Sequence, residues 1–390
     1  MRILLANKFY YRRGGDCIYT MNLEKMLKEK GHEVAMFAMQ YPENEPSEWA
    51  DYWPTRMTTL DALTRPFGTR QVVKGFTRLL NDFKPDVVHL NNIHTQLSPI
   101  IAKIAHERDV RVVWTLHDTK LVCPCYTCSR QGRWCTECFT HKTAVIKHRC
   151  MPGGLAGACI GFLEAKKWNN VVLQKYVDLF MPPSQFMMNT CVAGGYDARK
   201  FRVLCNFMDD KKVAQASQLP LAKEDYYVYL GRVDAIKGVR TLCEAASCLP
   251  MKLIIVGGGE LLPELQQRYK DKTQIVFKGQ QAWHEFMPIL RKARFMVLPA
   301  ECSENNPLTV IESLSIGTPV LGASIGGIPE LLEEGVNGMT FTSGNVDDLK
   351  QKIMCMFNHP FHYDAIAQQA AERFSSEAYY EKLMACYKGV

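Results

Sequence analysis

Short apolar runs and amphipathic segments alternate along the first 200 residues. Runs that suit buried strands occur at Arg2–Ala6, Val34–Ala38, Val87–Leu90, Val110–Leu116 and Leu179–Met181. Between the first two runs, residues 18–30 carry apolar side chains at helical spacing, and Gly31 follows as a stop signal. Residues 156–176 predict a second, longer helix. Strands and helices that alternate without hairpin signals are typical of a parallel, doubly wound sheet.

The alternation starts again after residues 209–225, which are polar, lack a clear period and predict a connection between domains. Strands are predicted at Tyr226–Leu230, Lys252–Val256, Ile275–Lys278, Phe295–Leu298 and Pro319–Gly322, and helices at Val239–Ser247, up to Tyr269, at Glu285–Arg291 and at Leu308–Ile316. We therefore predict an α/β protein with two doubly wound, parallel-sheet domains of the Rossmann-like type. The predicted domains are residues 1–207 and 208–375, and the helix in 376–390 is expected to pack back on the first domain.

Composition places the chain among ordinary globular proteins. Of its 390 residues 47% are hydrophobic and 22% are charged, and no run of 18 uncharged apolar residues predicts a transmembrane helix. The N-terminal apolar run is interpreted as a core strand and not as a signal peptide, so a cytoplasmic location is expected. Residues 1–180 contain 25 Lys and Arg against 17 Asp and Glu, a net charge of +8, whereas the rest carries −1. This excess indicates either a phosphate-bearing partner, an anionic membrane surface, or only a solvated basic face.

Fifteen cysteines are present, and the segment between Cys123 and Pro152 interrupts the strand and helix pattern with Cys, Lys and Gly. Two C-x2-C pairs end at Cys128 and Cys138, with six residues between the pairs. Without a secretion signal, reduced thiols are expected. A tetrahedral zinc site, free buried thiols and a disulfide all remain open from the residues alone. The basic residues nearby would also fit a nucleic-acid-binding zinc knuckle, but this interpretation is rejected and no nucleic-acid partner is expected.

Two glutamates follow the predicted strand that ends near Leu298. Glu304 lies in a polar loop, and Glu312 lies about two turns into the helix that starts near Pro307. In a doubly wound fold this loop faces the carboxyl edge of the sheet, where ligands bind. The two carboxylates could accept hydrogen bonds from a sugar and a ribose, or they could simply be solvated.

Two glycine-containing turns follow other strands of the second half. Arg232 and Lys237 stand five residues apart after Gly231, a pattern that can clamp two phosphates or form a basic surface turn. Gly258 lies in a glycine turn that could serve a nucleotide, although its spacing does not fit a dinucleotide-binding G-x-G-x-x-G motif.

The first half offers its own candidates at strand ends. Gly14 and Gly15 precede a helix whose N-terminus could hold a phosphate, or they form a plain tight turn. His117 follows a strand at the carboxyl edge, next to Asp118, which could also cap the next segment. Ser184, His89 and His94 are weaker candidates, and the two histidines are interpreted as structural.

Glu304, Glu312, the segment Ser-Ile-Gly317-Thr-Pro319-Val and Gly326-Gly327-Ile-Pro-Glu330 together resemble the retaining glycosyltransferases of family 4, the glycosyl transferases group 1. The resemblance covers essentially the whole chain and is close to bacterial capsule, O-antigen and exopolysaccharide members. It implies the GT-B fold of two facing Rossmann-like domains. It also implies a nucleoside diphosphate sugar donor, no catalytic metal, and a glycan acceptor linked to lipid, with peripheral contact to the inner membrane face.

The resemblance also assigns roles to residues. Glu304 and His117 would contact the donor sugar, Glu312 the ribose, and Arg232 and Lys237 the leaving diphosphate. Gly14 and Gly15 would approach the donor phosphates. Backbone amides that would bind the donor belong to Asn305, Asn306, Leu308 and Thr309. The cysteines that match a Cys-rich insertion of related transferases are Cys123, Cys135, Cys138 and Cys150, and the chain lacks one further cysteine of that pattern.

The mechanism implied is charge stabilisation of an oxocarbenium-like transition state, with retention along a front-side path. Two alternatives remain: a GT-B-fold epimerase, and a sugar-nucleotide binder without catalysis. A phosphorylase would need a cofactor lysine that the sequence does not show.

Overall fold

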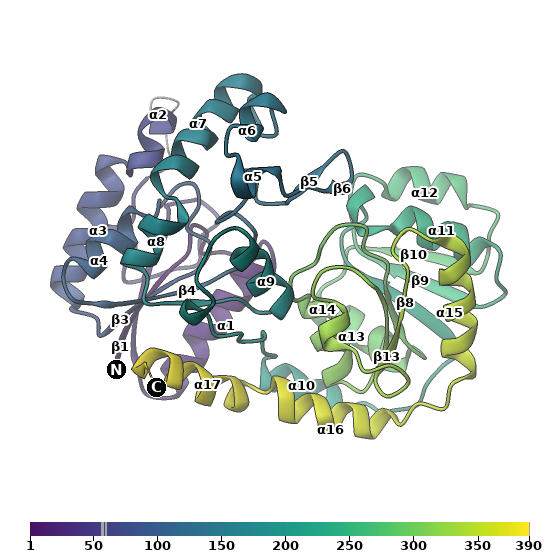
Figure 1. Ribbon diagram of the computed structural model, residues 1–390. Helices are drawn as coiled ribbons and strands as arrows, with labels where there is room; N and C mark the ends of the chain where they lie inside the picture. Colours follow the sequence, from purple (N-terminus) through teal and green to yellow (C-terminus); the bar gives the residue numbers. More distant parts are fainter. Residues whose placement is uncertain (56–57, 59–60, 390) are drawn as a thin grey trace. The chain divides into compact units, whose positions relative to one another are not determined.

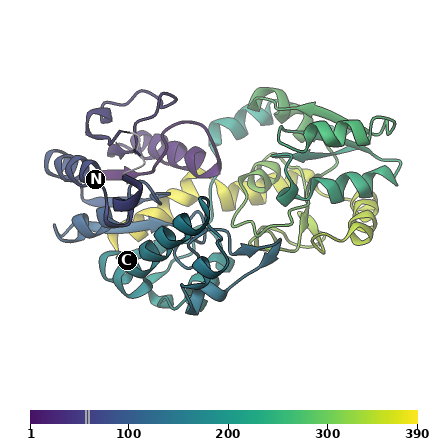
Figure 2. The same ribbon diagram turned by 90° about the horizontal axis from the view of Figure 1, so that it is seen from above.

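The computed structural model describes residues 1–55, 58 and 61–389, and the chain divides into two compact units (Figure 1). The N-terminal unit comprises Met1–Leu204 and Glu381–Val390, and the C-terminal unit comprises Cys205–Tyr380. This division falls three residues before the expected boundary at 207. Both ends of the chain belong to the N-terminal unit (Figure 2).

The N-terminal unit is built on a five-stranded parallel sheet with the order β2-β1-β3-β4-β7. Its strands are β1 (Arg2–Ala6), β2 (Glu33–Phe37), β3 (Val87–Leu90), β4 (Arg111–Thr115) and β7 (Leu179–Met181). Ile3 of β1 pairs with Val34 on one side and with Val87 on the other. Almost every residue of these strands is buried, as expected for a parallel sheet that is covered on both faces.

Helices connect these strands and cover both faces of the sheet. They are α1 (Gly15–Glu29), α3 (Arg70–Phe83), α4 (Ile100–His106), α7 (Gly154–Lys167), α8 (Asn170–Tyr176) and α9 (Gln185–Ala193). Figure 1 shows α3, α4 and α8 together on one side of the sheet and α1 on the other. The end of α17 (Ser376–Lys388) also packs here: the Tyr387 hydroxyl lies 2.7 Å from His89 Nδ1, inside the core.

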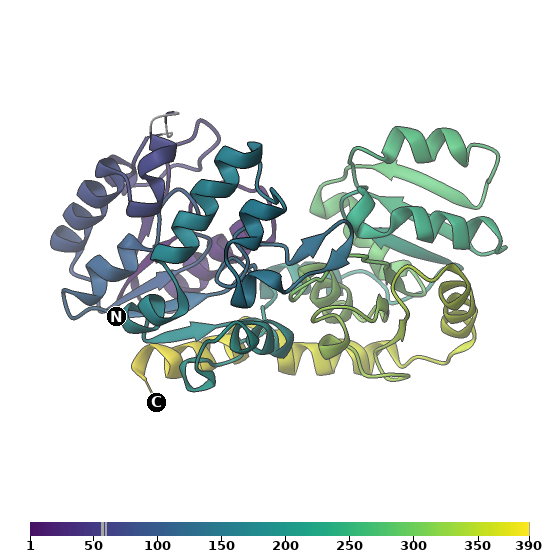
Figure 3. The same ribbon diagram turned by 45° about the horizontal axis from the view of Figure 1, so that its top comes forward.

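The Cys-rich segment forms small elements of its own. They are β5 (Ser129–Arg130), β6 (Arg133–Trp134), α5 (Glu137–Thr140) and α6 (Ala144–Lys147). β5 and β6 make an antiparallel hairpin separate from the five-stranded sheet (Figure 3). The single helix predicted over 156–176 is wrong, because α7 ends at Lys167 and α8 begins at Asn170. Asn169 caps α8 by accepting a hydrogen bond from Val172 N at 3.1 Å, a side-chain bond that starts a new helix.

The C-terminal unit holds a six-stranded parallel sheet with the order β10-β9-β8-β11-β12-β13. Its strands are β8 (Tyr226–Leu230), β9 (Lys252–Val256), β10 (Ile275–Gly279), β11 (Met296–Leu298), β12 (Val320–Ala323) and β13 (Gly338–Phe341). Its helices are α10 (Asp210–Ser217), α11 (Val239–Ser247), α12 (Leu262–Arg268), α13 (Trp283–Lys292), α14 (Leu308–Ser315), α15 (Val346–Asn358) and α16 (Tyr363–Phe374). α11 packs against α15, and α14 packs against α16 (Figure 1). The predicted fold class, two Rossmann-like parallel α/β domains, is confirmed.

Short helical turns complete both units. They are η1 (Ala50–Tyr52), α2 (Asp61–Thr64), η2 (Arg65–Phe67), η3 (Ala198–Lys200), η4 (Ala235–Lys237) and η5 (Pro329–Leu331). The polar connection predicted at 209–225 is partly wrong, because α10 occupies its first half. Asp209 caps that helix by accepting a hydrogen bond from Lys211 N at 3.1 Å, and Ala216 is buried against the C-terminal core. In the described part of the chain, no helix has the length and apolar character needed to cross a membrane.

Candidate active site

The turn after β8 and the loop after β11 meet at the carboxyl edge of the C-terminal sheet. η4 ends at Lys237, and the next residue, Gly238, has a left-handed φ of +69°; a Cβ added there would lie 1.8 Å from the Pro299 carbonyl oxygen. Only glycine allows the two backbone segments to come this close. In consequence Lys237 Nζ donates to Glu304 Oε1 and forms an ion pair with it, although 67 residues separate them. Their side chains are 21% and 17% exposed, so the pair is reachable from solvent.

The loop after β12 contacts the backbone of Glu304. Gly327 N donates to the Glu304 carbonyl oxygen at 2.7 Å. Gly326 has a φ of +62°, and a Cβ there would lie 2.2 Å from the same oxygen. Sequence reasoning used these glycines only as a mark of the family. The structure shows that they position the backbone of Glu304.

Arg232 lies in the same turn as Lys237 but points to solvent. Its side chain is 69% exposed, and its Nη2 lies 3.1 Å from Asp234 Oδ2. The Tyr229 hydroxyl donates to the Arg232 carbonyl oxygen at 2.6 Å and steadies the turn. The guanidinium is therefore a solvent-exposed cation in the turn that also carries Lys237. An exposed ion pair is weak, so an anionic ligand could displace Asp234.

The glycine turn after β9 packs against the turn after β8. A Cβ at Gly257 would lie 1.8 Å from the Gly231 carbonyl oxygen, and one at Gly259 would lie 2.3 Å from that of Val233. The Gly258 carbonyl oxygen accepts a hydrogen bond from Val233 N at 2.9 Å. These glycines therefore allow close contact between two loops, whether or not a nucleotide lies on them. Binding of the donor by Gly258 stays a prediction.

Glu312 lies on α14, behind the Glu304 loop. Burial raises the pKa of its carboxyl from the usual 4.5 to about 7, and the Lys212 ammonium opposes the shift only in part. Within the described residues its side chain has no hydrogen bond or ion pair. The residue is half-buried, and carboxyls with a raised pKa concentrate at functional sites. This isolation is the strongest structural sign that Glu312 awaits a ligand.

Asn306 turns toward the protein. Asn206 N donates to its Oδ1 at 3.1 Å, and Asn206 Nδ2 donates to its carbonyl oxygen at 2.9 Å. The side chain therefore joins the loop after β11 to the first residues of the unit, and donor binding by the backbone amide of Asn306 stays a prediction. Leu308 and Thr309 begin α14, where the first N–H groups of a helix lack partners within the helix. Donor contacts of these two residues and of Asn305 stay predictions.

In the N-terminal unit, His117 follows β4 at the carboxyl edge of the sheet. Its Nε2 lies 3.1 Å from Asn91 Oδ1, and its ring meets that of Tyr19 edge-on at 5.1 Å between centroids. Burial lowers the pKa of His117 below its usual 6.5, so the ring is neutral near pH 7. A neutral imidazole can hydrogen-bond a sugar hydroxyl without a net charge.

The N-terminus of α1 lies next to the carboxylate of Asp16. Gly14 is the extended N-cap residue, and Asp16 in the first turn accepts a hydrogen bond from Asn92 Nδ2 at 2.7 Å. Burial opposes ionisation of Asp16, but His117, the Asn92 bond and Lys8 outweigh it and lower its pKa. An ionised carboxylate at a helix N-terminus occupies the position that suits a phosphate. Phosphate binding at Gly14 and Gly15 therefore stays a prediction. The Asp16 carboxylate, which would compete with the phosphate, was not considered in the sequence analysis.

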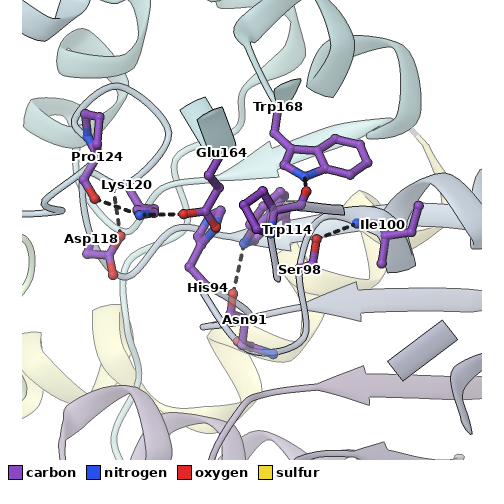
Figure 4. A network of polar contacts seen from close by, with 11 residues as sticks. Asn91, His94, Ser98, Ile100, Trp114, Asp118, Lys120, Pro124, Glu164 and Trp168 are labelled. Atoms are coloured by element: carbon purple, nitrogen blue, oxygen red, sulfur yellow. Dashed lines mark hydrogen bonds and ion pairs between the residues drawn. The ribbon is translucent and has the colours of Figure 1, made fainter. Parts of the chain in front are cut away.

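A buried charge network supports the segment that follows His117 (Figure 4). Lys120 Nζ lies 3.0 Å from Glu164 Oε2 and donates to the Pro124 carbonyl oxygen at 2.7 Å. Burial opposes ionisation of Glu164, but the Lys120 ammonium and His94 bring its pKa down to about 2. Lys120 N also donates to Asp118 Oδ1 at 2.9 Å. α7 thus anchors the chain immediately after His117 and Asp118.

Three weaker candidates have structural partners. Ser184 caps α9 by accepting a hydrogen bond from Met187 N at 3.2 Å. His89 lies in the core between Tyr387 and Thr115, 2.8 Å from the Thr115 Oγ1. His94 packs on Trp114 with 5.2 Å between ring centroids.

The cysteine cluster differs from the expected set. The Cys123 and Cys125 sulfurs are 3.3 Å apart, and hydrogen bonds from the thiols of Cys125, Cys128 and Cys138 lower the pKa of Cys123. Of the expected set, Cys123 and Cys138 belong to this hydrogen-bonded group, whereas Cys135 and Cys150 do not. Within residues 1–55, 58 and 61–389, no group of three or more His, Cys, Asp or Glu side chains could hold a metal ion. Zinc binding by Cys123, Cys135, Cys138 and Cys150 therefore stays a prediction.

Two family models match the chain, one for each α/β unit. The model described as "Glycosyl transferase 4-like domain" matches residues 14–206, and "Glycosyl transferases group 1" matches residues 210–373. The chain belongs to the GT-B glycosyltransferases.

Among curated proteins, the chain is 23% identical over 358 residues to an uncharacterised 42.6 kDa protein of the cps region of Klebsiella pneumoniae, covering 85% of this chain and 87% of that protein. It is 26% identical over 168 residues to an uncharacterised glycosyltransferase of Methanocaldococcus jannaschii, which covers 43% of this chain and 46% of that protein.

Solved structures share the fold along the whole chain. The lipopolysaccharide outer core galactosyltransferase WaaB has a TM-score of 0.71 at 16% identity, with full coverage of both chains. Anabaena HepE in complex with UDP has the same TM-score, identity and coverage. At these identities the likeness concerns the fold alone.

Proposed function

We propose that the protein transfers a sugar from a nucleoside diphosphate sugar to a glycan acceptor, with retention of the anomeric configuration. The observation that carries this proposal is the partly exposed Lys237–Glu304 ion pair at the carboxyl edge of the C-terminal sheet, in a turn that also carries the solvent-exposed Arg232, which pairs with Asp234. A carboxylate with two nearby cations suits a ligand that combines sugar hydroxyls with a diphosphate.

The reaction breaks the bond between the anomeric carbon and the phosphate oxygen and forms one to the acceptor oxygen. Lys237 and Arg232 would stabilise the negative charge that develops on the diphosphate, so that no divalent cation is needed. Glu304 would hold the sugar by its hydroxyls, and Glu312 the ribose. Retention follows if the leaving phosphate oxygen takes the acceptor proton on the same face.

His117 would contribute from the N-terminal unit as a neutral hydrogen-bond partner of the donor sugar. Its ring is fixed by Asn91 and Tyr19, and the Lys120–Glu164 network anchors the chain just beyond it. A rotamer held in this way binds without paying much conformational entropy.

The donor and acceptor classes have support of different kinds. Anabaena HepE, which shares the fold, has been solved with UDP and with UDP-glucose, which favours a nucleoside diphosphate sugar as donor. The relative from the cps region of Klebsiella favours a role in surface polysaccharide synthesis. The +8 charge of residues 1–180 favours an acceptor on lipid diphosphate and contact with an anionic membrane surface.

The test is donor turnover by the purified full chain with a panel of UDP-, GDP-, ADP- and dTDP-sugars. Glu304→Gln and Arg232→Ala are expected to abolish transfer and slow donor hydrolysis while the circular dichroism spectrum is unchanged. The matched controls are Glu224→Gln and Lys292→Ala. These residues form an exposed ion pair of 3.0 Å beside the opposite end of β8, and both variants should keep full activity.

Two results would contradict the proposal. Saturable binding of a nucleotide sugar without any turnover would indicate a binding protein. Wild-type rates in both Glu304→Gln and Arg232→Ala would show that the site lies elsewhere. The anomeric configuration of the product, measured by NMR, decides between retention and inversion.

A further inference from the structure

The segment after β2 forms an open pocket in the N-terminal unit that the proposed chemistry does not use. Its volume is about 460 Å³, and its lining includes Gln40, Tyr41, Asn44, Glu45, Ser47 and Thr55. Amide, carboxyl and hydroxyl side chains around an aromatic ring are the groups that recognise the hydroxyls and apolar faces of sugars.

The pocket is formed before any ligand arrives. Gln40 N donates to the Pro54 carbonyl oxygen at 2.9 Å, and Gln40 Nε2 donates to that of Ala50 at 3.1 Å. Asn44 Nδ2 donates to the Met39 carbonyl oxygen at 2.8 Å, whereas Asn44 Oδ1 has no partner among the described residues. A preformed wall loses little entropy when a ligand binds.

Three aromatic rings join this pocket to the end of β1. Tyr41 lies 5.3 Å from Phe9 and 6.0 Å from Tyr11, and Phe9 and Tyr11 are 5.5 Å apart, between ring centroids. Gln96 Nε2 donates to the Tyr41 hydroxyl at 2.6 Å and fixes that ring. All three are half-buried, so part of this aromatic platform faces solvent.

The charge of the segment selects among ligands. Residues 40–55 contain Glu43, Glu45, Glu48 and Asp51 but no Lys or Arg, within a half of the chain that is otherwise basic. Like charges repel, so a uronic acid or a phosphate is disfavoured at the pocket itself, whereas Lys8 and Arg13 lie over the ring of the neighbouring Phe9. The lining also includes Pro42, Pro46 and Trp53, so apolar surface accompanies the polar groups. A neutral sugar, which presents both hydroxyls and apolar faces, fits this combination.

The strand order gives an estimate of the distance between the pocket and His117. Carboxyl ends of parallel strands lie at one edge of a sheet, and the order β2-β1-β3-β4 puts three strand spacings between the pocket and His117. At ~4.8 Å per spacing this is about 14 Å. A single pyranose ring cannot span it, whereas an oligosaccharide can.

We propose that the pocket of residues 40–55, with the platform of Phe9, Tyr11 and Tyr41, is a distal acceptor subsite for a neutral sugar of an oligosaccharide chain. The inference depends on the proposed function only in that the bound sugar is called part of the acceptor. Binding of a neutral oligosaccharide to the pocket is a separate property of the N-terminal unit.

The experiment is saturation-transfer NMR on the full chain with maltotriose, cellotriose and chitotriose as neutral probes, glucose as the short probe and trigalacturonate as the anionic one. At least one neutral trisaccharide should bind more tightly than glucose and than trigalacturonate. Tyr41→Ala should weaken that binding about tenfold, which is the size of a lost aromatic contact. Tyr41→Phe keeps the ring and should retain most of the binding.

Tyr176→Ala is the matched control, because Tyr176 is another half-buried tyrosine of the same unit, at the end of α8. It should leave binding unchanged. Glu45→Gln should improve binding of trigalacturonate, an effect that a merely structural role of the segment would not produce.

The inference is overturned if none of the neutral trisaccharides binds, if glucose binds as tightly as they do, or if Tyr41→Ala binds like the wild type. Donor hydrolysis separates this failure from failure of the proposed function. A wild-type protein that binds the trisaccharide but hydrolyses no donor would refute only the transferase proposal, and one that hydrolyses donor but binds no trisaccharide would refute only this inference.

Discussion

Replacing Glu312 by glutamine should make the unliganded protein more stable and the nucleotide complex weaker. Burial raises the pKa of this carboxyl from 4.5 to about 7, and nothing in the described part of the chain hydrogen-bonds to it. In the folded state the group therefore holds a proton between pH 4.5 and 7 that the unfolded chain releases. Stability falls as the pH rises through this window, and the loss is complete above pH 7.

The magnitude follows from the two pKa values. A difference of about 2.5 units corresponds to ~3 kcal/mol at pH 8. This is an upper limit, because the residue is partly exposed and solvent screens the charge. Glutamine has the same shape and no charge, so Glu312→Gln should remove the pH dependence and recover much of this energy.

Ligand binding should change in the opposite direction. If the ionised carboxylate accepts hydrogen bonds from the ribose, its loss should weaken nucleoside diphosphate binding by ~10- to 100-fold, because hydrogen bonds to charged groups contribute about 1.5–3 kcal/mol. For the wild type, affinity should increase from pH 6 to 8 as the carboxyl ionises.

The assay is urea unfolding at pH 5, 6.5 and 8, together with calorimetric titration of the nucleoside diphosphate that the wild type binds best. Glu244→Gln on the exposed face of α11 is the control and should change neither quantity. A variant that loses stability at pH 8, or that binds the nucleotide as well as the wild type, would refute the reasoning.

Three further predictions concern other parts of the site. Gly326→Ala places a Cβ against the Glu304 carbonyl oxygen, and we expect kcat to fall by about tenfold or more while far-UV dichroism is unchanged; an unaffected kcat would show that the loop adapts freely. Glu164→Gln leaves Lys120 buried without its carboxylate, so urea unfolding should show a loss of about 3–5 kcal/mol, and a loss below ~1 kcal/mol would argue against a buried ion pair. Treatment with EDTA should leave the transfer rate unchanged, because Lys237 and Arg232 supply the positive charge; a rate restored only by Mg²⁺ or Mn²⁺ would contradict this.

Much of the fold could be predicted from the sequence, because buried parallel strands are continuous apolar runs. The strands at Arg2–Ala6, Val87–Leu90, Leu179–Met181 and Tyr226–Leu230 have the predicted bounds. Elements that depend on tertiary contacts were missed. α10 lies in a polar stretch, and α16 covers α14 through a few buried side chains that carry no signal until their partner is known.

The candidate site divides in the same way. Residue types and strand-end positions were sufficient to select Glu304, Glu312, Arg232 and Lys237 as candidates. Sequence reasoning could not foresee that Asn306 turns inward to Asn206, or that Asp16 occupies the start of α1. The direction of a side chain depends on which loop packs beside it, and this packing cannot be predicted from a single sequence.

What the sequence by itself determined is the set of chemical groups and the periodicity that makes two parallel sheets. Tertiary structure alone decided which groups meet. Lys237 and Glu304 touch because β8 and β11 are neighbours, although β9 and β10 come between them in the chain. Strand order is set by how helices cover the two faces of a sheet, a long-range packing outcome that no local pattern of residues encodes.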